Sequence, residues 1–306
     1  MTDEQLTLMA VFAHPDDEVW VGASMAMYAD QGIRTVLVTA TLGEEGMIRD
    51  PDLDSEEVRE RLGEIREAEL RRSAEIIGIS QLYVLGYRDS GMAGTPANED
   101  PRNFHNADPH DAIGQLVRII RRERPQVIVT DNERGTYGHP DHLAAHRTTL
   151  AAFDAAGDPA QFPDAHLEPW QPQKLYYAAF AHSDFLRMGE LLRERGISRG
   201  NEEELEESLD FTVPDDAVTT RVNTLAYRER VRDAMRAHRT QISPDDPWLN
   251  LPEDLAAELQ LTDTFTRARS LVDAPLPEDD LFAGLRAGQS LRGGQREPHP
   301  RSRVTP

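Results

Sequence analysis

The stretch Leu8-Met-Ala-Val-Phe-Ala13, followed at once by His14-Pro-Asp-Asp-Glu18, decides the fold that the sequence predicts. A short, continuous apolar run that ends at a proline-containing turn is typical of a strand buried on both faces. A polar cluster directly after such a strand lies at its carboxyl end, where open α/β sheets bind their ligands. We therefore expect an α/β fold in which functional residues follow the strands.

Working outward from this strand, short apolar runs alternate with helical patterns up to residue 153. Strands that are apolar throughout are typical of parallel sheets covered by helices on both faces. We therefore expect a Rossmann-like, doubly wound, mostly parallel sheet. Its further strands are expected over 35–39, 82–85, 127–130 and 175–179, and its helices over 22–30, 113–120 and 227–239.

One longer helix is expected between the second and third strands. Asp54 and Glu57 have the spacing of a capping box, which predicts that the helix opens there. Apolar residues then recur at helical spacing from Val58 to Ile77, and Gly78 is suited to the left-handed conformation that ends many helices.

The C-terminal half has weaker patterns. The acidic run over 202–207 is expected to be a solvated helix face, and 244–285 is rich in proline and expected to be irregular. We predict a metal-binding α/β core over 1–160, and a C-terminal part over 161–285 that completes the fold and the substrate pocket. A basic tail over 286–306 is expected to be disordered. One continuous domain fits the same pattern nearly as well.

Composition limits the partners. With 33 basic and 55 acidic residues, the chain carries a formal charge of −22, which repels a phosphate backbone. No apolar run approaches the length of about 18 residues that a membrane span needs, and the polar N-terminus does not resemble a signal peptide. We expect a small-molecule substrate, no nucleic-acid or membrane partner, and a cytoplasmic location. A homo-oligomer is compatible with the sequence.

The cluster after the first strand has the composition of a metal site. His14, Asp16, Asp17 and Glu18 bring an imidazole and three carboxylates together, and such charges are costly to hold side by side without a cation. Pro15 restricts the backbone, so that His14 and Asp17 can turn toward one point. Imidazole nitrogen and carboxylate oxygen are ligands that suit Zn²⁺. The alternative is an exposed acidic turn.

A second cluster, Tyr137-Gly-His-Pro-Asp-His142, follows the strand over 127–130. Pro140 is suited to the first position of a helix, which puts His142 in the first helical turn, at the same sheet edge as His14. His146, four residues further along the helix, is the rival third ligand. Asp131 and Glu133 are candidates for a second layer of contacts around the metal.

The chemistry follows partly by elimination. The chain has no P-loop, no G-x-G-x-x-G after its first strand and no G-x-S-x-G, and it lacks cysteine altogether. A metal-activated water is therefore the nucleophile that remains for a hydrolase. Two other classes stay open: a metal-dependent phosphoesterase, which would recruit more carboxylates, and a sugar-binding protein without catalysis.

The two motifs together, Ala13-His-Pro-Asp-Asp-Glu18 and His139-Pro-Asp-His142, resemble those of the LmbE / PIG-L family of zinc N-deacetylases. The α/β pattern over 6–153 fits that family's fold. Stretches 41–45 and 88–94 are similar to the deacetylase of the mycothiol pathway that acts on N-acetylglucosaminyl-inositol. Four later stretches are more similar to the S-conjugate amidase of that pathway: 162–165, 174–177, 236–241 and 281–284.

The resemblance implies a zinc-dependent amidohydrolase that acts on a linear amide. It implies that His14, Asp17 and His142 hold one zinc ion per chain and that Asp16 is the general base. The expected substrate is an N-acyl amino sugar or a thiol conjugate of one. We take cleavage of the thiol-conjugate amide as the main prediction and deacetylation of N-acetylglucosaminyl-inositol, or of another N-acetyl sugar, as the alternative.

Further roles are implied at positions that match the family. His139, paired with Asp141, resembles the histidine that stabilises the oxyanion or protonates the leaving amine. Tyr137 is similar to a tyrosine that polarises the carbonyl. Arg66 and Asp89 resemble residues that contact sugar and inositol.

One departure from the family's pattern concerns the substrate pocket. Val19-Trp20-Val21 stands where these enzymes usually carry small or polar residues. Trp20 is close in sequence to the metal-binding loop, so it is a candidate aromatic wall for a bulky, partly apolar substrate group. A tryptophan buried in the core is the alternative.

Overall fold

The computed structural model describes residues 5–163, 167–196, 208–246, 248–258 and 262–286. Its seven-stranded sheet has the order β3-β2-β1-β4-β5-β7-β6, in which the first five strands are parallel and β7 pairs antiparallel with both β5 and β6. The predicted α/β class with a mostly parallel sheet is confirmed. The strands are β1 (Thr7–Phe12), β2 (Arg34–Thr39), β3 (Gln81–Val84), β4 (Val127–Thr130), β5 (Lys174–Ala179), β6 (Thr220–Val222) and β7 (Asp263–Ser270).

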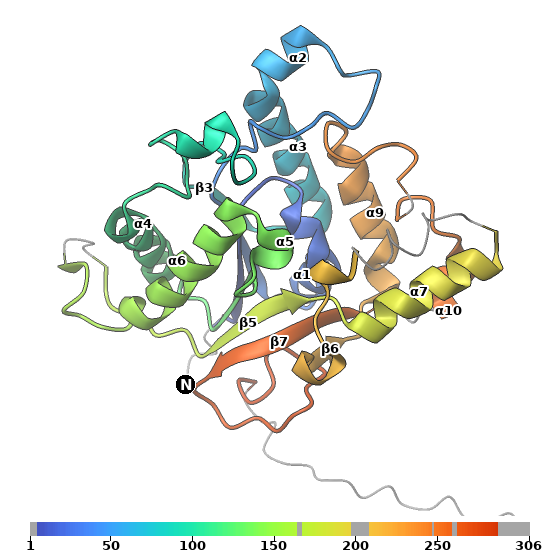
Figure 1. Ribbon diagram of the computed structural model, residues 1–306. Helices are drawn as coiled ribbons and strands as arrows, with labels where there is room; N and C mark the ends of the chain where they lie inside the picture. Colours follow the sequence, from blue (N-terminus) through green and yellow to red (C-terminus); the bar gives the residue numbers. More distant parts are fainter. Residues whose placement is uncertain (1–4, 164–166, 197–207, 247, 259–261, 287–306) are drawn as a thin grey trace, which may run out of the picture.

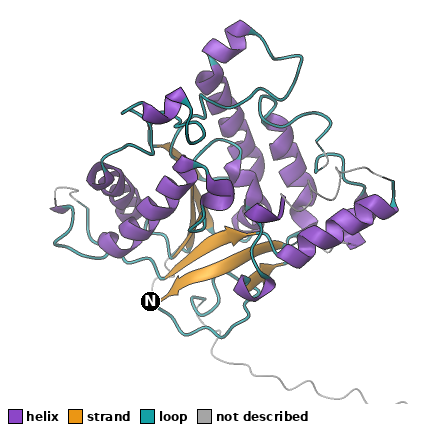
Figure 2. Cartoon of the chain, in the orientation of Figure 1, coloured by secondary structure: helices purple, strands orange, loops and turns teal. Residues whose placement is uncertain are grey.

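Helices cover both faces of the sheet (Figures 1 and 2) because alternate residues of β1 are apolar on each side. Leu8 and Phe12 pack on the face covered by α1 (Gly22–Asp30), α3 (Leu62–Ile77) and α9 (Arg228–Ala237). On the opposite face, Met9 and Val11 pack against α4 (Pro109–Glu123) and α6 (Pro140–Ala156).

The remaining elements are short or peripheral. The α-helices are α2 (Glu56–Glu60), α5 (Gly135–Gly138), α7 (His182–Glu194) and α10 (Glu253–Glu258). The 3-10 helices are η1 (Asp17–Trp20), η2 (Pro96–Glu99), η4 (Ser208–Phe211), η5 (Asp215–Ala217) and η6 (Leu225–Tyr227). Within the described residues, no helix is both long and apolar enough to cross a membrane.

The prediction of one helix that opens with a capping box at Asp54 is wrong in two respects. The capping residue is Ser55, whose hydroxyl accepts the Val58 N–H, while the Asp54 carboxylate pairs with Arg59. The chain also breaks at Arg61, so that α2 and α3 are separate helices. The cause is burial: α2 has no buried residue, whereas α3 buries one face against the sheet. Gly78 ends α3 in the left-handed conformation, as predicted.

The region over 244–285 is more regular than expected, since it contains α10 and the eight-residue strand β7. The short strand β6 was also not predicted. Strand β7 pairs with β5 on one side and β6 on the other, so tertiary pairing organises a sequence that is mostly polar. The acidic run over 202–207 and residues 287–306 of the expected tail lie outside the described residues.

Candidate metal centre

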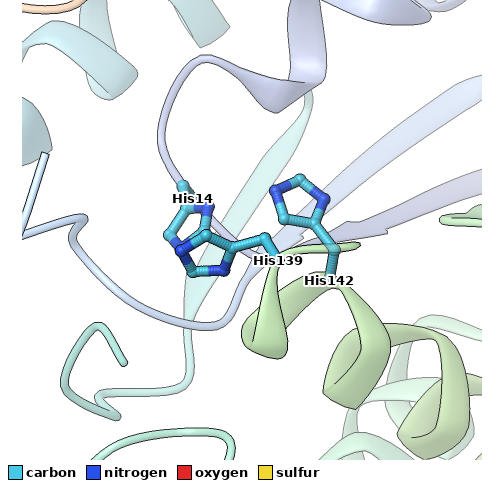
Figure 3. A group of neighbouring side chains, drawn as sticks. All are labelled: His14, His139 and His142. Carbon is cyan, nitrogen blue, oxygen red and sulfur yellow. The ribbon is translucent and has the colours of Figure 1, made fainter. Parts of the chain in front are cut away.

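Both motifs lie at the carboxyl edge of the sheet. Strands β1 and β4 are parallel neighbours at the point where the strand order reverses, the usual ligand-binding position in such sheets. His14 follows β1, whereas His139 caps the N-terminus of α6 and His142 lies in its first turn. The three rings point toward one another (Figure 3), and one nitrogen of each lies within 4.8 Å of the others.

Asp17 lies between two of these histidines. One oxygen of its carboxylate is 3.8 Å from His14 Nδ1, and the other is 3.6 Å from His142 Nε2. The oxygen near His14 also accepts the backbone N–H of that residue at 2.8 Å. The three side chains that the sequence predicted as ligands therefore meet, with His139 as an additional nitrogen beside them.

For His14 and His142, carboxylates on the far side of the ring determine which nitrogen faces Asp17. His142 Nδ1 is 2.8 Å from Asp131 Oδ1, and His142 Nε2 is buried without a hydrogen-bond partner among the described residues. His14 Nε2 faces Asp141 at 3.4 Å and Asp89 at 3.5 Å, which leaves Nδ1 toward Asp17. A histidine that binds a metal with one nitrogen usually donates the other to a carboxylate, so these donors fit a zinc ion.

Burial and charge perturb the titration of these groups. Burial raises the pKa of Asp17 to about 6, although His142 and His14 oppose the rise. For both histidines, burial lowers the pKa but the neighbouring carboxylates raise it further, so the net shift is upward. Buried groups that perturb one another's pKa in this way are typical of functional sites, and a cation would compensate the carboxylates.

A second group of possible ligands comprises His14, Asp89, His139 and Asp141. The Asp141 carboxylate already accepts the backbone N–H and hydroxyl of Ser90 and the backbone N–H of His105. Asp89 accepts the backbone N–H groups of Glu45 and Gly91. Because these oxygens are occupied, we assign the two carboxylates to orienting His14 rather than to binding a second ion.

The rival ligand points elsewhere. His146 Nδ1 is 3.1 Å from the backbone carbonyl of Asp131, and its ring packs beside Tyr177. Glu133 is exposed and is not among the clustered side chains. Asp131 contacts His142 directly and therefore occupies the second layer that the sequence suggested for it.

His139 has a defined orientation. Its Nδ1 accepts the backbone N–H of Asp141 at 3.1 Å, so the proton of the neutral ring is on Nε2. Burial and the neighbouring His14 and His142 lower the pKa of His139 to about 4, which keeps it neutral near pH 7. The expected pairing with Asp141 thus uses the backbone of that residue, while its carboxylate faces His14.

Asp16, next to Asp17 in the chain, has an unusual backbone conformation. Its φ is 98°, and its N–H donates to Glu18 Oε2 at 2.9 Å. The side chain remains 28 % exposed. Arg66 lies beneath it, fully enclosed, and donates to the carbonyls of Gly43 and Pro15 and to Asp16 Oδ1 at 3.3 Å.

Aromatic side chains line the centre on another side. Trp20 is partly buried and stacks on His142, with centroids 5.7 Å apart and ring planes at 25°. Its edge meets Phe180, which in turn contacts Phe211. Tyr137 is half exposed, and its ring lies 5.2 Å from that of His142.

Sequence reasoning missed two groups behind the centre. Glu18 is fully buried against Ser73 and against His238, which is 220 residues away in the chain. The stretch 236–241 was noted for its similarity to amidases, but no periodicity or spacing connects it to Glu18. Ser90, in the stretch 88–94, was likewise not assigned to Asp141.

Comparison with known proteins decides the family. The model of the family described as "PIG-L: GlcNAc-PI de-N-acetylase" matches residues 9–153. A 1D-myo-inositol 2-acetamido-2-deoxy-alpha-D-glucopyranoside deacetylase of Geodermatophilus obscurus is 44 % identical over 293 residues, covering 91 % of this chain and 97 % of the relative. This chain belongs to the PIG-L family. It is therefore a hydrolytic enzyme, as the sequence predicted.

A second relative and a solved structure extend the comparison. A mycothiol S-conjugate amidase of Streptomyces coelicolor is 40 % identical, covering 94 % of this chain and 99 % of the relative. The N,N'-diacetylchitobiose deacetylase of Pyrococcus horikoshii has the same fold, with a TM-score of 0.59 at 19 % identity over 85 % of this chain and 83 % of that one. PIG-L deacetylases are metalloenzymes, and the cluster at the sheet edge could bind a metal.

Proposed function

We propose that this enzyme is a zinc-dependent hydrolase that cleaves the amide of an N-acylated glucosaminyl-inositol. One observation carries the proposal: His14 Nδ1 and His142 Nε2 both face the Asp17 carboxylate, while other carboxylates hold their opposite nitrogens. These three residues would hold the ion. A bound zinc ion supplies Lewis-acid polarisation of the amide carbonyl and makes water acidic enough to ionise near pH 7.

Asp16 is the residue that accepts the proton of the attacking water. It neighbours the proposed ligand Asp17, and its carboxylate is partly open to solvent while Arg66 contacts one of its oxygens and Glu18 accepts its backbone N–H. A carboxylate in this position is an acceptor until it takes the proton, and it then becomes an acid that can donate. Asp16 therefore also returns this proton to the leaving amine.

His139 and Tyr137 stabilise the oxygen on which negative charge develops. The neutral His139 ring carries its proton on Nε2, the nitrogen on the side away from its capping bond with Asp141. Such a donor stabilises an oxyanion by about 2.7–4 kcal/mol. A neutral imidazole is a poor source of a proton for the amine, which favours the oxyanion role for His139 over the general-acid role.

Arg66 and Asp89, which the resemblance implies as sugar contacts, are both buried beside the centre, where they hold Asp16 and His14. Asp89 lies 3.5 Å from His14 Nε2 and 4.0 Å from His139 Nε2, and Arg66 lies against Asp16. Relatives of similar identity are named for acting on an acetamido-glucosyl inositol or on mycothiol conjugates. In our proposal both substrates present an N-acylated glucosaminyl-inositol, so the acyl group is what separates them.

Trp20 favours the larger acyl group. Its ring stacks on the proposed ligand His142 and continues through Phe180 to Phe211, an apolar wall that an acetyl group does not need. We therefore propose the amide of a thiol conjugate as the preferred substrate. Deacetylation remains the second candidate, because the deacetylase of Geodermatophilus obscurus covers nearly the same residues at higher identity.

The test is a side-by-side measurement of kcat/KM for the thiol-conjugate amide and for N-acetylglucosaminyl-inositol. We expect the conjugate to be cleaved at least as fast, with Trp20→Ser lowering its kcat/KM more than that of the acetyl substrate and Trp20→Phe lowering it little. Deacetylation more than about tenfold faster, a difference of about 1.4 kcal/mol, would reverse the choice of acyl group. Hydrolysis of a phosphate ester in place of both amides would contradict the amidase itself.

A further inference from the structure

The backbone of Asp16 is held in a conformation that this residue rarely adopts. Its φ of 98° and ψ of −23° lie in the left-handed region. A residue other than glycine in a sparsely populated conformation is strained and persists only where surrounding contacts impose it. The contacts that impose this conformation also determine where the Asp16 carboxylate lies.

Glu18 supplies the main-chain contact. Its Oε2 accepts the Asp16 N–H at 2.9 Å. The other oxygen accepts the hydroxyl of Ser73, in α3, and is 2.6 Å from His238 Nε2. Glu18 is 1 % exposed, so its carboxylate depends on these partners for compensation.

The position of His238 is fixed by contacts outside the loop that carries Asp16. It follows α9 directly and is fully buried. The next residues are anchored independently: Arg239 pairs with Asp50, and Thr240 donates to Glu69 from both its N–H and its hydroxyl. His238 therefore offers Glu18 a donor whose place does not depend on the loop that carries Asp16.

We propose that His238 is a positioning residue for catalysis, which holds Glu18 so that Glu18 holds Asp16 in its left-handed conformation. The inference rests on the proposed role of Asp16 as the base. It means that residues beyond 153, outside the family match, help to aim the base. His238 is fully buried with Nε2 against Glu18, and in this proposal it acts only through Glu18.

The experiment compares His238→Met with His238→Gln. Methionine fills the space without a donor, whereas the glutamine amide can reach Glu18 in place of Nε2. We expect His238→Met to lower kcat roughly 10- to 100-fold, as expected for a base displaced by up to about 1 Å, with unchanged KM and zinc content. His238→Gln should restore most of the rate. Arg236→Gln, which removes only an exposed pair with Asp233 on α9, is the matched control and should be active.

A shorter side chain provides a second comparison if His238→Met does not fold. His238→Asn keeps a polar amide but falls short of Glu18, so it should be impaired where His238→Gln is not. Equal activity of the asparagine and glutamine variants would overturn the positioning role, as would loss of zinc from His238→Met.

The double variant with Asp16→Asn tests the route of the effect. If His238 acts through the base, adding His238→Met to Asp16→Asn should lower kcat less than twofold further, because neighbouring effects on one function do not add. A full 10- to 100-fold further loss would overturn the positioning role alone. A wild-type kcat for Asp16→Asn would instead overturn the base assignment on which the inference rests.

Discussion

Each histidine beside Asp17 commits one ring nitrogen to a carboxylate and turns the other to the centre. Asp131 orients His142, whereas Asp89 and Asp141 orient His14. These partners come from the segments after β3 and β4 and from the first turn of α6, so the orientation of the ligands depends on several elements along the carboxyl edge of the sheet. Removing a ligand and removing its neighbour should therefore have different consequences.

The comparison of His142 with His146 tests the ligand assignment. His142→Ala removes a ring nitrogen from the centre and should abolish zinc binding or weaken it severely. His146→Ala should keep one zinc ion per chain, because His146 faces the carbonyl of Asp131. Metal analysis of the two purified variants decides the matter, and the opposite pattern would show that the ligands are misassigned.

Asp16→Asn separates metal binding from proton transfer. The amide keeps the shape of the side chain but cannot accept the proton of water, so kcat should fall about 10²- to 10⁴-fold with zinc content unchanged. Steady-state kinetics on the metal-loaded variant measure the loss. A variant that kept nearly the wild-type kcat would exclude Asp16 as the base.

The residues of the centre were predictable from the sequence to a limited extent. His14, Asp17 and His142 could be brought together because both motifs follow strands of one parallel sheet. Asp131 was a candidate contact because it directly follows β4, but the approach of Asp89 to His14 could not be predicted, since Asp89 follows β3 and reaches the ring only in the folded chain. The same holds for His238, which meets Glu18 across 220 residues.

At the scale of elements, β7 not only pairs with β5 and β6 but also caps a helix. Helix α1 has no side-chain cap from its own N-terminal residue, but Asp263 at the start of β7 accepts the N–H of Ser24 at 2.7 Å. Strand β7 thereby satisfies a free donor at the N-terminus of a helix more than 200 residues earlier. The negative charge of the Asp263 carboxylate also suits that end of the helix.

Asp263→Ala should destabilise the protein by about 0.5–2 kcal/mol, the usual loss for a helix cap. Asp263→Asn keeps an acceptor oxygen and should lose less. Denaturant unfolding of the two variants measures the difference, with metal content held equal. Equal stabilities of wild type and Asp263→Ala would mean that water caps α1 equally well.

Sequence patterns predicted best the elements whose own apolar residues indicate that they are buried. Strands β1 and β4 are apolar throughout, and their observed bounds differ from the prediction by at most a residue. Strand β7 was missed because Thr, Arg and Ser fill most of it and only its pairing with β5 and β6 makes it a strand. The break at Arg61 was missed because helix spacing continues through it while burial does not.

At the scale of the whole molecule, a buried ionic cluster joins β5 to the C-terminal segment. Lys174 Nζ lies 2.6 Å from Glu278, which also accepts from Tyr176, Thr220 and Arg267. Strands β7 and β6 extend the sheet of the N-terminal part beyond β5. The division of the chain near residue 160 stays a prediction.

Net charge at this scale agrees with the proposed substrate. A chain with a formal charge of −22 gains nothing by steering polyanions, so a neutral or mildly polar amide suits it better than a phosphate ester. The function of the enzyme then depends on one cation that compensates the carboxylates around His14 and His142.

The most direct test is amine release before and after the metal is removed. We predict that the protein stripped by a chelator stays folded, releases no amine from either amide substrate, and recovers its activity with one equivalent of zinc per chain. The apoprotein of Asp16→Asn should bind the same equivalent without recovering activity. Amine release at the untreated rate from metal-free protein would contradict the account.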